Sequence, residues 1–134
     1  MTTIDPALAL FANDSFYRAF ATRDLHAMSE LWAETQPVYC VHPGWPALFG
    51  RVEVLDSWRR ILGNPQAPKI VSYGATVLHF GATAAVICYE QLAGGVCLAS
   101  NGFVYEFERP RMVWHQSGPC EAPPPNEDKP PNWQ

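Results

Sequence analysis

Apolar residues in the first third of the chain recur every three or four positions. The first such run contains Leu8, Phe11, Ala12, Phe16, Ala19 and Phe20. This spacing places the apolar side chains on one face of a helix. Asp5-Pro6 supplies its start, because Asp caps a helix N-terminus and proline fits the first turn without losing a hydrogen bond. The pattern also predicts a short helix after Asp24 and a third helix over residues 51–62.

Strand-like stretches follow, rich in β-branched and aromatic residues. The first covers residues 38–42, and Pro43-Gly44-Trp45-Pro46 ends it because proline cannot donate to a strand ladder. Four more are predicted over residues 70–80, 84–92, 96–107 and 112–116. Short connections favour antiparallel neighbours, so the last four strands form a meander.

This element order predicts an α+β fold: three helices packed on one face of a strongly curved, mostly antiparallel sheet. A curved sheet closed on one side by helices makes a cone, and its open interior is a natural pocket. Residues 1–119 form the single domain in this interpretation, and residues 120–134 form a Pro-rich, flexible tail.

Composition narrows the functional classes. Of the 134 residues, 48% are hydrophobic and 16% charged, with a net charge of −4. The chain therefore has no basic surface for nucleic acid, and its apolar runs are too short to span a bilayer. The N-terminus lacks a secretory signal pattern, which predicts a cytoplasmic protein. The four cysteines are widely spaced, so we expect neither a metal nor another cofactor.

His42 is the strongest catalytic candidate. It shares a strand face with Val38 and Cys40 and leads into a stiff loop, a rigid position that suits a general base. The alternative is a histidine whose ring bonds a loop carbonyl. His115 is a second candidate, although alternation alone leaves open whether His115 or Gln116 points into the cone.

Glu90 and Asn101 are polar residues within apolar strands, where each needs a partner. Glu90 either orients a nearby histidine or, in the interpretation we favour slightly, pairs across strands with Arg51 or Arg111. Asn101-Gly102 can equally mark a bulge.

Two tryptophans are candidate pocket walls. Prolines flank Trp45, which keeps it out of a regular element and favours a place at the pocket. Trp58 lies on the predicted third helix, where a core position is the commoner explanation.

The chain resembles the nuclear transport factor 2-like superfamily, and within it the SnoaL-like and ketosteroid isomerase-like branch of small bacterial proteins. The resemblance covers Leu8 to about Pro119. It is carried by Phe16-Tyr17-Arg18-Ala19-Phe20, Arg23-Asp24-Leu25, Leu31-Trp32-Ala33, Val41-His42-Pro43-Gly44-Trp45, Gly50-Arg51, Ser57-Trp58 and Trp114-His115-Gln116. It implies the cone-shaped fold and a homodimer, but no single chemistry.

In the isomerases a carboxylate base followed by proline lies late in the first strand, the position that His42-Pro43 holds here. An oxyanion donor comes from a tyrosine of the first helix. Tyr17 is displaced from that position by one residue, and Phe16 takes the matching place. Their second donor has no clear counterpart, and Asn101 is the nearest polar residue. Steroid isomerisation is therefore disfavoured.

Two functions follow from this reasoning. In the first, the protein is a cofactor-independent isomerase or lyase in which His42 removes a proton next to a carbonyl. Tyr17, Asn101 or His115 then stabilises the oxyanion. In the second, it is a noncatalytic module that binds a small apolar or aromatic metabolite or supports dimerisation. The ligand-binding residues predicted in either case are Tyr17, Trp45, Trp58, Glu90, Asn101 and His115.

Overall fold

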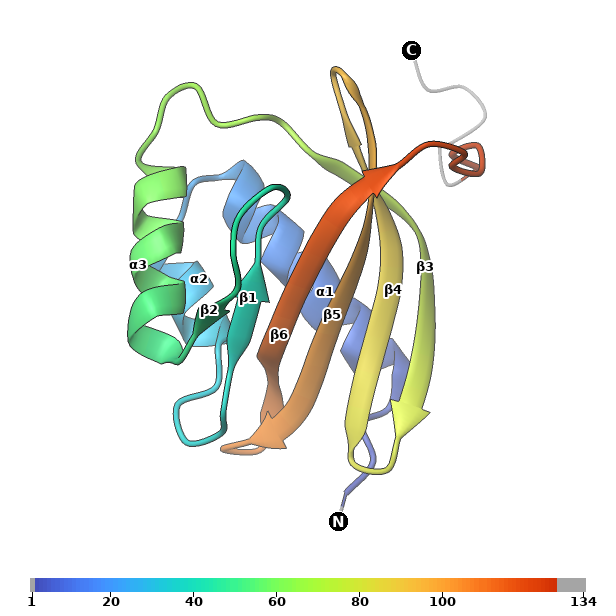
Figure 1. Cartoon of the computed structure of the whole chain (residues 1–134). Helices are drawn as coiled ribbons and strands as arrows, with labels where there is room; N and C mark the ends of the chain where they lie inside the picture. The colour runs from blue at the N-terminus through green and yellow to red at the C-terminus, as the bar shows by residue number, and fades with distance from the viewer. Residues whose placement is uncertain (1, 128–134) are drawn as a thin grey trace.

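The computed structural model describes residues 2–127, which form three helices and one six-stranded sheet (Figure 1). The helices are α1 (Pro6–Ala21), α2 (Leu25–Leu31) and α3 (Arg51–Leu62). The strands are β1 (Tyr39–Val41), β2 (Leu48–Phe49), β3 (Val71–Phe80), β4 (Thr83–Leu92), β5 (Gly95–Glu106) and β6 (Arg109–Cys120). The predicted α+β fold is confirmed.

The starts of α1 and α2 are set by the predicted caps. The Asp5 carboxylate accepts the Ala7 N–H at 2.8 Å, and the Asp24 carboxylate accepts the Ala27 N–H at 3.0 Å. Each cap satisfies a backbone donor that the first turn of a helix leaves free. None of the helices in residues 2–127 is long and apolar enough to cross a membrane.

The last four strands form the predicted antiparallel meander within the order β2-β1-β6-β5-β4-β3. Strand β6 is longer than predicted, because the ladder with β5 continues to a tight turn at Phe107 and Glu108, both with positive φ. The register shifts between Gly102 and Phe103, next to the predicted bulge at Asn101-Gly102, but the extra residue, Val113, lies on β6. A Cβ at Gly102 would lie 2.3 Å from the Trp114 ring, so this packing requires glycine.

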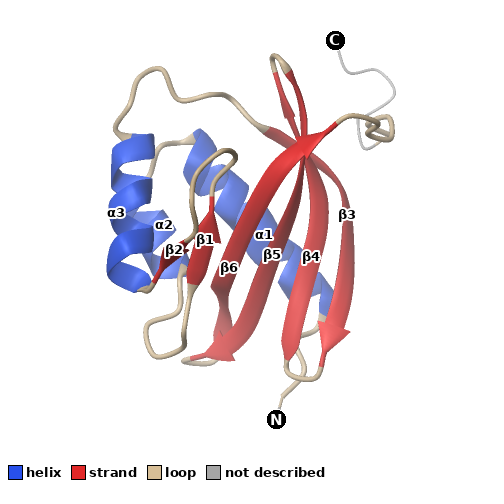
Figure 2. Ribbon diagram, in the orientation of Figure 1, coloured by secondary structure: helices blue, strands red, loops and turns tan. Residues whose placement is uncertain are grey.

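Two pairings were not predicted. Strand β2 pairs with β1, and β1 runs parallel to β6, with Cys40 opposite His115 and Val41 opposite Gln116 (Figure 2). The parallel pairing joins the first strand to the end of the meander. It therefore brings His42, just after β1, next to His115 on β6.

All three helices lie on one side of the curved sheet (Figure 2). On the opposite face, Ile87 and Tyr89 are half-buried, Leu98 is exposed, and the rings of Tyr39 and Trp114 stack at 6.3 Å. This face is the surface on which the predicted homodimer depends.

The predicted tail begins later in the structure than in the sequence interpretation. Strand β6 includes Cys120, and the Tyr73 hydroxyl donates to the Pro124 carbonyl oxygen at 2.8 Å. Residues 128–134 lie outside the described residues, so a flexible tail stays a prediction.

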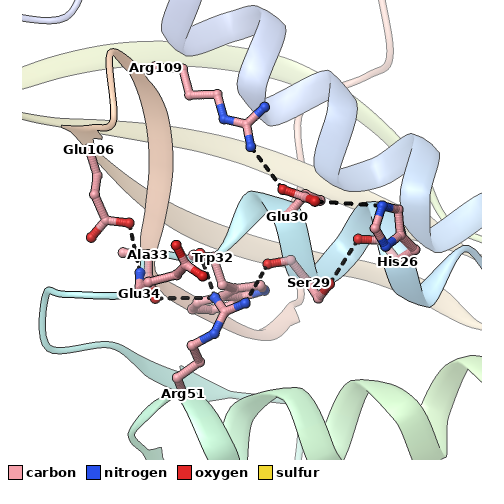
Figure 3. Close-up of polar contacts among 9 residues, drawn as sticks. All are labelled: His26, Ser29, Glu30, Trp32, Ala33, Glu34, Arg51, Glu106 and Arg109. Atoms are coloured by element: carbon pink, nitrogen blue, oxygen red, sulfur yellow. Dashed lines mark hydrogen bonds and ion pairs between the residues drawn. The ribbon is translucent and has the colours of Figure 1, made fainter.

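Two buried polar contacts tie α2 to its neighbours (Figure 3). The Arg51 guanidinium donates to the carbonyl oxygens of Ser29, Trp32 and Ala33 at 3.0, 2.6 and 3.3 Å. The Glu106 carboxylate accepts the N–H groups of Glu34 and Thr35 at 2.7 and 2.8 Å. Both side chains thus satisfy backbone groups where α2 ends and the chain turns towards β1.

Candidate functional site

A cavity of about 270 Å³ opens between α1, α3 and the concave face of the sheet. We call it the central pocket. It is lined by Phe16, Tyr17, Phe20, His42, Pro43, Trp45, Trp58, Ile61, Pro68, Ile70, Glu90, Leu92, Cys97 and His115. A larger but shallower groove between α2 and α3 has only exposed or half-buried side chains, so the central pocket is the better ligand site.

His42 lies at the end of β1 and points inward, on the face predicted from Val38 and Cys40. Its side chain is buried, and the rings of Trp45 and Trp58 meet it edge-on at 4.8 and 4.7 Å. Its Nε2 lies 2.9 Å from the Ser57 hydroxyl oxygen, and the Cys40 sulfur is also close. His42 is therefore fixed from α3 as well as from its own strand.

The Ser57 contact determines which ring nitrogen of His42 carries the proton. Ser57 donates its single hydroxyl proton to the Val54 carbonyl oxygen at 2.7 Å, a common bond for a serine within a helix. Its oxygen then accepts from His42, so Nε2 is protonated and Nδ1 keeps its lone pair, with the Cys40 sulfur, a weak donor, 3.9 Å away. The hydrogen-bond partner of the His42 ring is therefore a serine of α3, and not the loop carbonyl considered as the alternative.

His115 lies beside His42 in the pocket wall, with ring centroids 6.1 Å apart. His115 is buried, whereas Gln116 is exposed. Of these two residues, His115 is therefore the one that points into the cone, a choice that the sequence left open. The His115 Nδ1 lies 2.6 Å from the Asn101 side-chain oxygen. A histidine that donates from Nδ1 keeps its lone pair on Nε2.

Asn101 sits behind His115 and does not line the pocket, although the sequence placed it among the ligand-binding residues. Its side-chain nitrogen donates to the Asn13 side-chain oxygen at 2.8 Å and to the Tyr17 hydroxyl at 3.2 Å. These bonds fix the orientation of the amide, so its oxygen must accept from His115. Asn101 therefore sets the tautomer of His115.

Glu90 lies at the far side of the same network. Its carboxylate accepts the Tyr17 hydroxyl at 2.6 Å and the Ser117 hydroxyl at 2.5 Å. The favoured pairing of Glu90 with Arg51 or Arg111 is therefore wrong. Glu90 points to the concave face with Tyr17 and Ser117, whereas Arg51 is committed to the carbonyl oxygens of α2.

Burial shifts the pKa values of these groups. It lowers the pKa of His42 to about 4, with a further contribution from His115, and it lowers the pKa of His115 to about 3. Both rings are thus neutral at pH 7. Burial also raises the pKa of Tyr17 and of Glu90, although the Ser117 and Tyr17 hydroxyls oppose the shift at Glu90. The pocket therefore holds neutral imidazoles beside a carboxyl group without a cationic partner in the described contacts.

Both predicted tryptophans line the pocket. Trp45 is 37% exposed and stands at its mouth, where the Arg60 guanidinium lies over the ring at 6.0 Å. Trp58 is buried and serves both as core and as pocket wall.

Sequence reasoning missed Asn13, Ser57 and Ser117. Asn13 interrupts the apolar face of α1, and Ser57 lies between Val54 and Trp58 on the apolar face of α3. Ser117 follows His115 by two residues and so shares its face. A polar residue on a predicted apolar face was therefore the available signal in each case.

The geometry within residues 2–127 contains no group of three or more His, Cys, Asp and Glu side chains that could hold a metal ion. Cys40, Cys88, Cys97 and Cys120 are free thiols. Burial raises the pKa of Cys40 well above its usual range and that of Cys88 to about 11, so these thiols are not reactive thiolates at neutral pH.

Fold and pocket together define a class: α+β proteins in which helices and a curved sheet enclose a small, mostly apolar ligand pocket. Residues 10–121 match the SnoaL-like domain. The chain belongs to this SnoaL-like family, within the NTF2-like fold group that the resemblance indicated.

Two solved structures are similar over nearly their whole length. One, from Streptomyces avermitilis, is described as a "putative dehydratase from the NTF2-like family". The two sequences are 32% identical, and the match includes 87% of this chain and 96% of the Streptomyces chain, with a TM-score of 0.78. The other, from Thiobacillus denitrificans, is described as a "putative calcium/calmodulin-dependent protein kinase type II association domain". It is 28% identical over 90% of this chain and 99% of its own, with a TM-score of 0.74.

A curated relative is the F-box protein SKIP8 of Arabidopsis thaliana, 28% identical over 107 residues. The match includes 78% of this chain but only 46% of the plant protein, so the chain spans about half of that relative.

Proposed function

We propose that the protein is a cofactor-independent lyase of the dehydratase type, which removes water from a small, mostly apolar molecule. His42 is the general base. One observation carries the proposal: a buried neutral imidazole lines an enclosed pocket and is held in one tautomer by Ser57. The similarity to the Streptomyces protein described as a dehydratase supports the same reaction class.

A single histidine can carry out both proton transfers of this reaction. The Nδ1 lone pair of His42 takes the proton of a C–H bond, and the released electron pair forms a C=C bond. The adjacent C–O bond breaks, and the leaving hydroxyl takes the same proton back from the imidazolium to depart as water. A pKa of about 4 weakens the base but makes the imidazolium a strong proton donor, which favours this return step.

The same hydrogen bonds argue against an enolate held by oxyanion donors. Tyr17 donates to Glu90, Asn101 donates to Asn13 and Tyr17, and His115 donates to Asn101. Each donor suggested by the sequence is already engaged. We therefore favour elimination over the isomerase alternative.

The test uses the aldol adduct of benzaldehyde and acetone as probe, because its loss of water yields a conjugated enone that is followed by UV absorbance. The His42→Gln variant should lower the enzyme-dependent rate about 10²- to 10⁴-fold, the usual contribution of a general base. His26→Gln is the matched control, since His26 is exposed on α2 and outside the pocket. Equal rates for wild type and His42→Gln would contradict the proposal, as would a wild type without any rate above that of buffer.

The second candidate function is a noncatalytic module that binds a small molecule or supports association. It is favoured by the 28% identity to the protein described as a kinase association domain. In that case His42→Gln changes ligand affinity without any rate to lose.

We also propose a homodimer formed through the open sheet face with Tyr39, Leu98 and Trp114. Apolar side chains without a covering helix favour such an interface. Sedimentation should give the dimer mass at micromolar concentration, and a monomer there would contradict this proposal.

A further inference from the structure

Most side-chain donors in the wall of the central pocket are already hydrogen-bonded within the protein, whereas several acceptors keep a lone pair. From this imbalance we infer that the pocket selects uncharged, hydroxyl-bearing aromatic or apolar molecules, small alcohols and phenols, and rejects carboxylates of the same size. The inference deepens the proposed function, because an alcohol is the substrate class that loses water.

The donors can be followed one by one. Tyr17 and Ser117 each donate their only hydroxyl proton to Glu90. The His42 Nε2–H points to Ser57, and the His115 Nδ1–H points to Asn101. Of the other wall residues, the Cys97 thiol is only a weak donor, and the Trp45 indole N–H belongs to a ring that is 37% exposed at the mouth, where water can accept from it.

Two further donors near the pocket are also withheld. The Trp58 indole N–H is buried without a partner and has essentially no accessible surface, so the cavity does not reach it. Arg60 at the mouth forms an ion pair with Asp56 at 3.1 Å. A ligand inside therefore meets no side-chain cation in the described lining.

The acceptors, in contrast, remain available. His42 keeps the lone pair on Nδ1, and His115 keeps the lone pair on Nε2. Glu90 lines the same cavity and carries further acceptor capacity on its carboxylate oxygens. A ligand hydroxyl that donates to one of these atoms gains a bond, and a ligand without a donor leaves them unsatisfied.

The cost of burying a charge also favours an uncharged ligand in the pocket. A ligand carboxylate would give up its water shell, find no free donor and lie near the Glu90 carboxyl group. An ammonium group would be attracted to Glu90, but it would give up a much stronger water shell than a hydroxyl group does on entering a largely apolar cavity. The wall is otherwise mostly aromatic and aliphatic, which suits an uncharged ring or short chain.

Three probes of nearly equal size test the inference at pH 7 in NMR titrations of the wild-type protein. Benzyl alcohol offers a donor, benzaldehyde only an acceptor, and benzoate a negative charge. Benzyl alcohol should bind tightest and benzoate weakest, with a difference of at least about tenfold in Kd. Benzoate binding as tightly as benzyl alcohol would overturn the inference, and so would no detectable binding of benzyl alcohol at millimolar concentration.

The Glu90→Gln variant tests the origin of the preference. It removes the negative charge and adds an amide donor, so the difference between benzyl alcohol and benzoate should narrow several-fold. Glu34→Gln makes the same change at an exposed position outside the pocket and should leave the difference unaltered. An unchanged preference in folded Glu90→Gln would contradict the role given to Glu90.

Binding and turnover separate this inference from the proposed function. Preferential binding of benzyl alcohol without dehydration of the aldol probe would leave the inference standing and remove the lyase proposal. Dehydration of the aldol probe without a preference for benzyl alcohol over benzoate would support the lyase proposal and overturn the inference about ligand selection.

Discussion

Two buried glutamates on the same sheet show how differently one residue type can be used. Glu106 at the end of β5 is 6% exposed, and Glu90 on β4 is 3% exposed. Their pKa values nevertheless shift in opposite directions, downward for Glu106 and upward for Glu90. Both side chains have little accessible surface, but Glu90 lies much deeper in the protein than Glu106 and has fewer hydrogen-bond donors, and these two differences together set the directions.

Glu106 is surrounded by donors that favour its charged form. Burial alone would raise its pKa, but the N–H groups of Glu34 and Thr35, the Thr35 hydroxyl and the nearby Arg111 outweigh it. Figure 3 shows the carboxylate pointing to the backbone of Glu34, where the chain leaves α2. Glu106 is therefore a structural carboxylate that holds a connection in place.

Glu90 has only two hydroxyl donors, from Tyr17 and Ser117, and it faces a cavity. Burial dominates, and its pKa rises. A buried carboxyl group with a raised pKa in a pocket is a common feature of functional sites, because such groups are poorly suited to stabilising a fold. The comparison therefore assigns a structural role to Glu106 and supports the proposed role of Glu90 in ligand selection.

The largest expected effect comes from matched amide substitutions. Glu106→Gln should lower the free energy of unfolding by about 2–3 kcal/mol, because it weakens several charge-assisted bonds to buried backbone N–H groups. Glu90→Gln should change it by less than about 1 kcal/mol, because the lost bonds are offset by removal of a poorly paired buried charge. Urea unfolding at pH 7 measures both. A larger loss of unfolding free energy for Glu90→Gln than for Glu106→Gln would contradict the comparison.

Acidification tests the pocket through its histidines. In the unfolded chain both imidazoles protonate near pH 6.5, whereas the folded protein holds the pKa of His42 at about 4 and that of His115 at about 3. Between these values the unfolded state binds more protons, so stability falls as the pH falls below 6.5.

Each histidine contributes a loss of up to about 2 kcal/mol between pH 7 and pH 5, and the raised pKa of Glu90 acts in the opposite direction and reduces the total loss. Urea unfolding at the two pH values measures it. Equal stability at both would show that the two rings are not held neutral by burial.

The smallest effect concerns the pH dependence of the Glu106 contribution. Because its folded pKa is lowered, its stabilisation is complete above pH 4.5 and is lost as the pH falls through the folded value. The penalty of Glu106→Gln should therefore shrink as the pH falls from 5 to 3. A penalty that stays constant over this range would mean that the carboxylate charge contributes nothing.

Local signals in the sequence predicted much of the fold. The starts of α1 and α2 were correct because Asp5 and Asp24 act on backbone groups two or three residues away. The meander was correct because its turns are short. The pairing of β1 with β6 joins residues more than seventy positions apart, and no local pattern encodes it.

The sequence predicted which residues line the candidate site better than it predicted their hydrogen-bond partners. His42, His115, Glu90 and Tyr17 were named, and all four line one pocket. The partner of Glu90 was wrong because charge suggested an arginine, whereas the sheet register and α1 supply two hydroxyl groups. Partners such as Ser57 depend on how α3 packs against β1, which follows from tertiary packing.

The most direct test of the account is the protonation state of His42, read from the NMR chemical shifts of its ring nitrogens as the pH is varied. The account predicts a neutral ring at pH 7 with the proton on Nε2, and protonation of Nδ1 only near pH 4. A charged ring at pH 7, or a neutral ring with its proton on Nδ1, would contradict it.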